Sequence, residues 1–235
     1  MDTQTRHALK QDKFAVATAS SMSWLSGHRS GLMRWVVSAV VVLVIVVGAL
    51  IFWSVKSGAA DNALGAALDL YSTPLASPGA PAEKNVYNTA ADRAKEANRE
   101  FVAIAKDYGW LPAGAKAHYF AGITYQELGQ TGPAESELKT AAGSWDRNLS
   151  NLAKLALAGL YRQIGRDAQA IELYNDLAKK PSITVSASVA QLDLADLYAS
   201  TGKQDQARAL WAKVKDADKD GMAGSLASQK LAGKQ

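Results

Sequence analysis

The sequence has no cysteine, and histidine occurs at only 3 of its 235 positions. Disulfide bonds are therefore excluded, and a chain without thiols fits an exocytoplasmic compartment, where a stray thiol risks mispairing. The histidines, His7, His28 and His118, are far apart and form neither a two-histidine metal motif nor a nucleophile–base pattern. No glycine-rich phosphate-binding loop is present. We therefore expect no enzyme activity and no cofactor.

Two further absences narrow the class of protein. No segment alternates apolar and polar residues as a half-buried strand would, so the sequence predicts an all-α fold. The formal net charge is +4, but the residues from Ser57 onward carry equal numbers of basic and acidic side chains. The positive excess lies before the first long apolar run and at Lys56. The large C-terminal part thus has no basic surplus to attract nucleic acid.

One apolar segment dominates the sequence. The 21 residues from Trp35 to Val55 carry no charge and are flanked by Arg34 and Lys56. As a helix they would extend about 31 Å, which matches the hydrocarbon core of a bilayer. Fourteen of them are valine, leucine, isoleucine or phenylalanine, and tryptophan lies near both ends, as is common at membrane interfaces. We predict a transmembrane helix at 34–56.

The distribution of positive charge predicts the orientation of this span. Five basic residues precede it, whereas the 20 residues after Val55 contain only Lys56. Because basic flanks stay in the cytoplasm, we expect a single-pass protein of the cell inner membrane with a cytoplasmic N-terminus and a periplasmic C-terminal domain. A cleaved signal peptide, with Ser57-Gly58-Ala59 as the cleavage site, is the alternative. The apolar run and the segment before it are longer than those of most signal peptides.

Composition divides the chain into four parts. A helix is predicted at Ala60–Tyr71, where Leu64, Leu68 and Tyr71 recur at helical spacing. Thr73–Lys84 contains three prolines and is predicted to be an extended linker. The predicted parts are a cytoplasmic tail (1–33), a transmembrane helix (34–56), a first helix with its linker (57–90) and a repeat domain (91–235).

The repeat domain contains three copies of one pattern, aligned on Gly129, Gly165 and Gly202. Each glycine follows a small residue by seven positions and a tyrosine by four, and it precedes an alanine by five and a bulky apolar residue by nine. This register predicts helix–turn–helix pairs in which the glycine ends the first helix and the small residue lets the helices approach closely. In chain order, the small residues are Gly122, Ala158 and Ala195, the tyrosines are Tyr125, Tyr161 and Tyr198, the alanines are Ala134, Ala170 and Ala207, and the bulky residues are Leu138, Tyr174 and Trp211.

These residues resemble tetratricopeptide (TPR) repeats over Ala115 to Val214. A degenerate unit precedes them, in which Ala97, Phe101 and Ile104 match a second helix, and 222–232 resembles the capping helix that repeat arrays need. The resemblance implies an α-solenoid of about three full repeats after the single transmembrane helix. Other two-helix repeats of similar length are the competing interpretation.

In TPR arrays the first helices line a concave, peptide-binding surface, and the resemblance implies which positions face it. The predicted groove is apolar and aromatic with a few charges, which suits extended or helical peptide segments. Burial of these side chains by a neighbouring helix or a second copy is the alternative interpretation. The groove residues are Tyr119, Ile123 and Gln126 in the first unit, Leu155 and Arg162 in the second, and Leu192 and Asp196 in the third.

One short segment resembles half of a metal site. Asp216, Asp218 and Asp220, followed by Gly221, reproduce the first half of a calcium loop. The twelfth position, which should supply a bidentate carboxylate, is Ala227. Because the segment also falls between two predicted helices, we favour a solvated turn over a weak calcium site.

A short cytoplasmic tail, one span and a periplasmic TPR domain together resemble the YfgM-type family, the ancillary subunits of the bacterial Sec translocon. That resemblance implies contact with the translocon, with a membrane-anchored periplasmic chaperone of the prolyl-isomerase type, and with exported polypeptides. The alternative keeps the fold and makes the domain a scaffold for cell-envelope assembly or cell division.

Overall fold

The computed structural model describes residues 29–76 and 87–233, with side chains from residue 33 onward. These residues form nine helices and no strand, apart from an isolated parallel bridge between Leu75 and Tyr87. The predicted all-α fold class is confirmed for this part of the chain. Most of the predicted cytoplasmic tail and the centre of the predicted linker, including Pro78 and Pro81, lie outside the described residues.

The first described helix, α2 (Arg29–Tyr71), contains both the predicted span and the predicted first helix of the repeat domain. The two were expected as separate elements, but no proline occurs between them and the helix continues through Gly58. The chain divides into two compact units, Met1–Val55 and Lys56–Gln235, so the boundary between the units lies inside α2.

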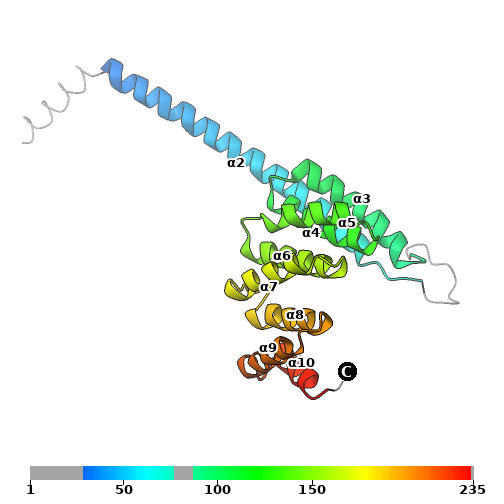
Figure 1. Ribbon diagram of the computed structural model, residues 1–235. Coiled ribbons are helices and arrows are strands. Elements are labelled where there is room, and N and C mark those ends of the chain that lie inside the picture. The colour runs from blue at the N-terminus through cyan, green and yellow to red at the C-terminus, as the bar shows by residue number, and fades with distance from the viewer. Residues whose placement is uncertain (1–28, 77–86, 234–235) are drawn as a thin grey trace, which may run out of the picture. The chain divides into compact units, whose positions relative to one another are not determined.

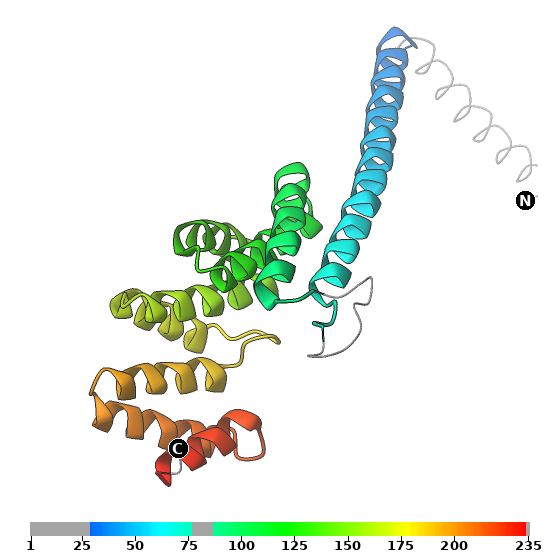
Figure 2. The same cartoon turned by 90° about the vertical axis from the view of Figure 1, so that its right-hand side faces the viewer.

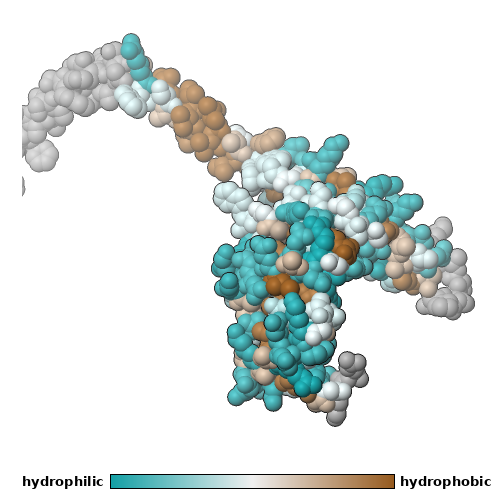
Figure 3. Space-filling model, in the orientation of Figure 1, coloured by the Kyte–Doolittle hydropathy of each residue, from teal (hydrophilic) through white to brown (hydrophobic). Residues whose placement is uncertain are grey.

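In the first unit, α2 is long and apolar enough to cross a membrane. Its valine, leucine and isoleucine side chains from Val36 to Val55 are all exposed in the structure, and Figure 3 shows this stretch as an apolar surface. Exposing this much apolar area to water is unfavourable by about 25 cal/mol per Å², whereas lipid tails accommodate it. Length, composition and exposure therefore fit a membrane-spanning segment.

In the second unit, eight helices follow the end of α2, and consecutive helices pack against each other. Figures 1 and 2 show them following one another in a row from α3 to α10. The helices are α3 (Ala90–Tyr108), α4 (Pro112–Glu127), α5 (Thr131–Ala142), α6 (Arg147–Gln163), α7 (Asp167–Lys179), α8 (Ala187–Ser200), α9 (Gln204–Ala217) and α10 (Met222–Leu231).

The three aligned glycines end the first helices of three pairs, as predicted. Gly129, Gly165 and Gly202 have φ angles of 71°, 74° and 79°, the left-handed region in which a Cβ is penalised. In each turn, the residue after the glycine donates its backbone N–H to the carbonyl of the aligned tyrosine, at 2.8–2.9 Å. This is the hydrogen bond of a Schellman cap, and it reverses the chain into the second helix. The pairs are α4 with α5, α6 with α7, and α8 with α9.

The interior of each pair follows the predicted register. Ala134, Ala170 and Ala207 are fully buried, and the bulky residues four positions later are buried as well. At Gly122, an added Cβ would lie 2.6 Å from Leu138 Cγ, so only glycine allows α4 and α5 to approach this closely. The predicted role of the small residue in helix approach is therefore confirmed at this position.

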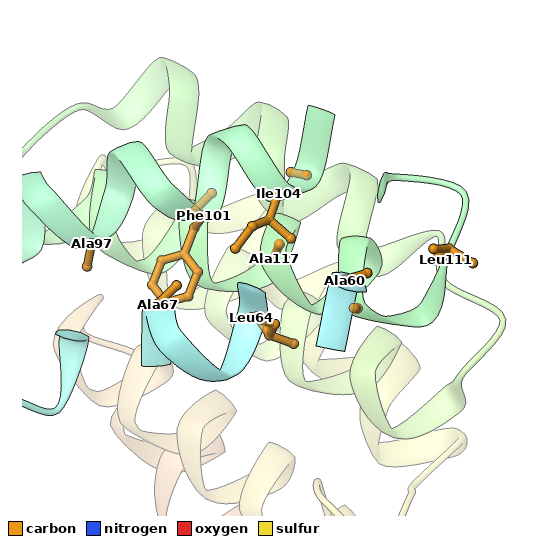
Figure 4. Close-up of a cluster of buried hydrophobic side chains, with 11 residues drawn as sticks. Ala60, Leu64, Ala67, Ala97, Phe101, Ile104, Leu111 and Ala117 are labelled. Atoms are coloured by element: carbon orange, nitrogen blue, oxygen red, sulfur yellow. The ribbon is translucent and has the colours of Figure 1, made fainter. Parts of the chain in front are cut away.

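The end of α2 packs antiparallel to α3 in the first hydrophobic cluster of the second unit. The Tyr71 ring lies 6.0 Å from the Phe101 ring and 5.5 Å from the Arg93 guanidinium, so the C-terminal end of α2 lies beside the part of α3 between Arg93 and Phe101. Figure 4 shows Ala60, at the other end of this stretch, near Ile104. The predicted second-helix residues Ala97, Phe101 and Ile104 are all buried here.

We predict opposite effects for two glycine substitutions in α6 and the turn that follows it. Gly165→Ala forces a Cβ into the left-handed region and should destabilise the second unit by about 1–2 kcal/mol. Gly159→Ala adds a methyl group to open space inside the helix and should stabilise it by about 0.5–1 kcal/mol. Thermal unfolding followed by circular dichroism measures both. Equal effects of the two substitutions would contradict the assigned turn geometry.

Candidate protein-binding surface

The predicted groove residues lie on α4, α6 and α8, the first helices of the three pairs. The first helices α4 and α6 also contact each other, and α8 packs on the last helix, α10. The second helices α5, α7 and α9 are not paired in this way within the described residues. The seven residues are therefore carried by helices that lie along one side of the second unit.

The apolar members of the predicted groove belong largely to the hydrophobic core. Leu192 is 8 % exposed and is part of the cluster formed by α8, α9 and α10. Tyr119, Ile123 and Leu155 are half-buried against the central cluster, and burial raises the pKa of the Tyr119 hydroxyl. The expected apolar and aromatic lining is thus mostly packed between helices, because the positions that face inward on a first helix also fill the contact with its neighbours.

The polar members form hydrogen bonds between helices instead. Gln126 Nε2 on α4 donates a hydrogen bond to Gln163 Oε1 at the end of α6, at 3.3 Å. Asp196 on α8 accepts hydrogen bonds from Lys230 Nζ of α10 at 2.9 Å and from Trp211 Nε1 of α9 at 3.0 Å. These contacts bring Gln163 and Lys230 to the predicted surface, and neither residue is among the predicted groove residues.

Two further charged residues lie on the same surface, Arg162 near the end of α6 and Asp193 on α8. Arg162 is exposed, and its charge acts on Asp193. Burial raises the pKa of the Asp193 carboxyl, the neighbouring Asp196 raises it further, and Arg162 and Lys230 oppose the rise. Asp193 accepts no hydrogen bond from any residue that the structure describes. A half-buried carboxylate without a hydrogen-bond donor is unfavourable in the free protein.

We call the side chains Gln126, Arg162, Gln163, Asp193, Asp196 and Lys230 the polar row. Tyr174 lies beneath it: its ring is buried in the central cluster, and burial with the nearby Asp193 and Asp196 charges raises the pKa of its hydroxyl to about 12. Asp193 could have been found from sequence, because it precedes Asp196 by one helical turn. Lys230 could not, since its position depends on how the last helix packs.

A second polar cluster holds α5 against α6 and the following turn. Glu135 accepts hydrogen bonds from Arg166 at 2.6 Å, from Lys139 at 2.7 Å and from the Tyr161 hydroxyl at 2.9 Å. Hydrogen bonds from Lys139 and Arg166 lower the pKa of the Glu135 carboxyl to about 2. The Arg166 guanidinium also lies 4.4 Å from the Tyr161 ring centroid. This cluster joins α5 to α6 and to the turn after α6, and it supports the fold.

The other chemical candidates have structural roles. His118 Nδ1 donates to Glu137 Oε2 at 2.6 Å, between α4 and α5. Asp218 Oδ2 accepts the backbone N–H of Gly224 and so satisfies a donor in the first turn of α10. Within the described residues, no group of three or more His, Asp or Glu side chains is placed to hold a metal ion, so Asp216, Asp218 and Asp220 are not brought together.

A search of protein-family models finds no match to this sequence, and a search of curated proteins finds none either. The resemblance to TPR repeats therefore depends on the residues and turns described above.

We predict that Glu135→Gln lowers the free energy of unfolding at neutral pH by about 1–2 kcal/mol, since it removes the charge that Arg166 and Lys139 stabilise. The folded-state pKa of Glu135 lies below its usual 4.5. Its contribution is thus complete above about pH 4.5 and is lost as the pH falls toward 2. As the pH falls through this range, the free energy of unfolding should decrease less in the variant than in the parent, as measured by denaturant titrations at several pH values. Glu172→Gln, an exposed position on α7 without an ion pair to a described residue, is the matched control.

Asp193→Asn should have the opposite effect on stability, because it should raise the free energy of unfolding at neutral pH. The folded-state pKa of Asp193 lies above its unfolded value, so the ionised carboxylate opposes folding at neutral pH and this penalty disappears below the unfolded value. The variant should therefore melt at a higher temperature than the parent near pH 7, and the difference should vanish near pH 3. A lower melting temperature at pH 7 would show that Asp193 has a stabilising partner.

Proposed function

We propose that this protein is a membrane-anchored TPR-type interaction protein of the cell envelope. The apolar part of α2 crosses the inner membrane, and the array of helix pairs lies on the periplasmic side. The array binds polypeptide segments along its first helices. It acts as an accessory factor of the Sec translocon and of the periplasmic chaperones that receive exported chains, as the resemblance to the YfgM-type family implies.

The repeat register supports the TPR-type solenoid. The three left-handed glycine turns have the same hydrogen bond to the aligned tyrosine, and the alanine positions after them are fully buried. The first helices α4 and α6 contact each other and α8 contacts α10, whereas no comparable contact joins α5, α7 and α9 in the described part. A stack with this asymmetry curves with its first helices on the inner side.

The observation that carries the proposed binding role is the polar row, and Asp193 within it. Its carboxylate is half-buried and lacks a hydrogen-bond donor in the described residues, next to the exposed Arg162. A group that costs stability in the free protein is typical of a site whose partner supplies the missing contact. Backbone amides or a basic side chain of a bound segment would supply it.

The same observation favours a second candidate function. A row of charged and amide groups discriminates between partners more strongly than an apolar groove, because each unmatched polar group costs free energy. One particular envelope protein, rather than many unfolded exported chains, fits such a surface. The array would then be a scaffold for envelope assembly or cell division.

Site-specific photo-crosslinking in living cells tests the binding role. A photo-reactive residue at Arg162 or Gln126 should form adducts with envelope proteins, identified by mass spectrometry. The same residue at Glu172 or Arg208, exposed positions on the second helices α7 and α9, is the matched control. Asp193→Asn should reduce the adduct yield at Arg162 by about tenfold, since a lost charge-assisted hydrogen bond is worth roughly 1.5 kcal/mol or more.

The identity of the cross-linked proteins distinguishes the two proposed functions. Many exported chains together with translocon subunits support the accessory role, whereas one discrete envelope partner supports the scaffold. Equal yields at the first-helix and second-helix positions would contradict both. Protease added to spheroplasts should digest the array, and its protection would contradict the periplasmic location.

A further inference from the structure

Large apolar side chains are exposed at the connections between successive helix pairs. These connections run from the end of α3, α5, α7 and α9 to the start of the next helix, and all lie on one edge of the second unit because paired helices are antiparallel. We call this edge the junction edge. Each of its connections exposes one large apolar side chain: Trp110 at 52 %, Trp145 at 103 %, Ile183 at 94 % and Met222 at 81 %.

The opposite edge, formed by the glycine turns inside the pairs, is different. In its described turns after α4, α6 and α8, the most exposed large apolar side chain is Ile164, at 37 %. Isolated exposed apolar residues are normal on a protein surface. Their recurrence at each junction, and not at the glycine turns, indicates a surface that is covered in the working molecule.

Basic residues accompany the first three junctions. Lys106, Arg147 and Lys179 are exposed, and none of them forms an ion pair with a described residue. Asp146, beside Trp145, is engaged as the N-cap of α6. The fourth junction has the opposite character, because Asp216, Asp218 and Asp220 precede Met222. Asp107, beside Lys106, is also exposed and forms no ion pair with a described residue, so a free basic residue without a free acidic neighbour occurs only at the second and third junctions. In Figure 2 the α7–α8 connection projects from the helices as a long yellow loop.

The junction edge is also the edge at which α2 enters the second unit. Tyr71 contacts Arg93 and Phe101 of α3, and the antiparallel packing of Ala60–Tyr71 on α3 therefore places Ala60 toward the end of α3. Ala60 shares a cluster with Ile104 and Leu111, on either side of Trp110. The chain that precedes Ala60 is Lys56 and then the apolar run of the predicted span.

We propose that the junction edge lies against the lipid bilayer, with Trp110, Trp145 and Ile183 in the headgroup layer and the basic side chains at anionic lipid phosphates. Tryptophan prefers this layer, and each basic residue near an anionic surface adds about 1 kcal/mol of attraction. The covalent link through α2 keeps the edge near the membrane, so weak lipid contacts suffice. The inference requires only that the apolar run spans a membrane, and it does not depend on the proposed polypeptide-binding role.

The absence of cysteine allows a direct test in the full-length protein. Single-cysteine variants Trp145→Cys and Ile183→Cys are labelled with an environment-sensitive fluorophore and reconstituted into vesicles containing phosphatidylglycerol. Thr131→Cys and Asp205→Cys, exposed positions next to the glycine turns, are the controls for the opposite edge. Val44→Cys, probed with lipids that are spin-labelled deep in the acyl chain, reports insertion of the span. Headgroup-level spin-labelled lipids should quench the junction labels at least threefold more than the controls.

The outcomes are distinct. Adding Arg147→Glu and Lys179→Glu to the labelled Trp145→Cys protein should reduce its quenching at least twofold, whereas a label that is still quenched would contradict the role of the basic residues. Equal quenching at both edges, with the span label inserted, would overturn the proposal and leave the junction edge to a protein partner. Loss of quenching at the span label would instead overturn the membrane anchor itself. Unchanged circular dichroism shows that each variant is folded.

Discussion

The second unit depends on one backbone constraint, the left-handed glycine that ends the first helix of each pair. At Gly129, Gly165 and Gly202 the chain adopts a conformation that side-chain-bearing residues rarely adopt, and the next N–H returns to a tyrosine carbonyl. This bond sets the angle at which the second helix leaves. The alanine and the bulky residue that follow then meet the first helix. The alignment of first helices along one side and of junctions along one edge follows from repeating this turn.

Much of this fold could be predicted from the sequence because the decisive signals are local. A glycine, a tyrosine and an alanine at constant spacing define a turn and the contact beside it, and neither requires knowledge of distant residues. The uncharged run from Trp35 to Val55 is equally local. The boundary between the span and the first helix of the repeat domain was less predictable. Glycine at position 58 can either end a helix or remain within one, and here α2 continues through it.

The candidate surface was harder to predict because it depends on which residues neighbouring helices cover. Helical periodicity placed Leu192 and Asp196 on one face, but it could not show that α9 and α10 bury the first and contact the second. Lys230 reaches the surface only through the position of the last helix. The position of Asp193 follows from its helical spacing to Asp196, but its partial burial and its lack of a hydrogen-bond donor are not visible in the order of residues.

The hydrophobic interior of the second unit is divided into four separate clusters, and each helix packs mainly on its neighbours in the chain. Such an array has no single centre whose loss unfolds everything at once. Mechanical tension between the membrane and a polypeptide held on the polar row would therefore be borne by a chain of small interfaces in series. A molecule arranged in this way can lengthen step by step under a pull and recover when the pull stops, as a compliant tether rather than a rigid arm.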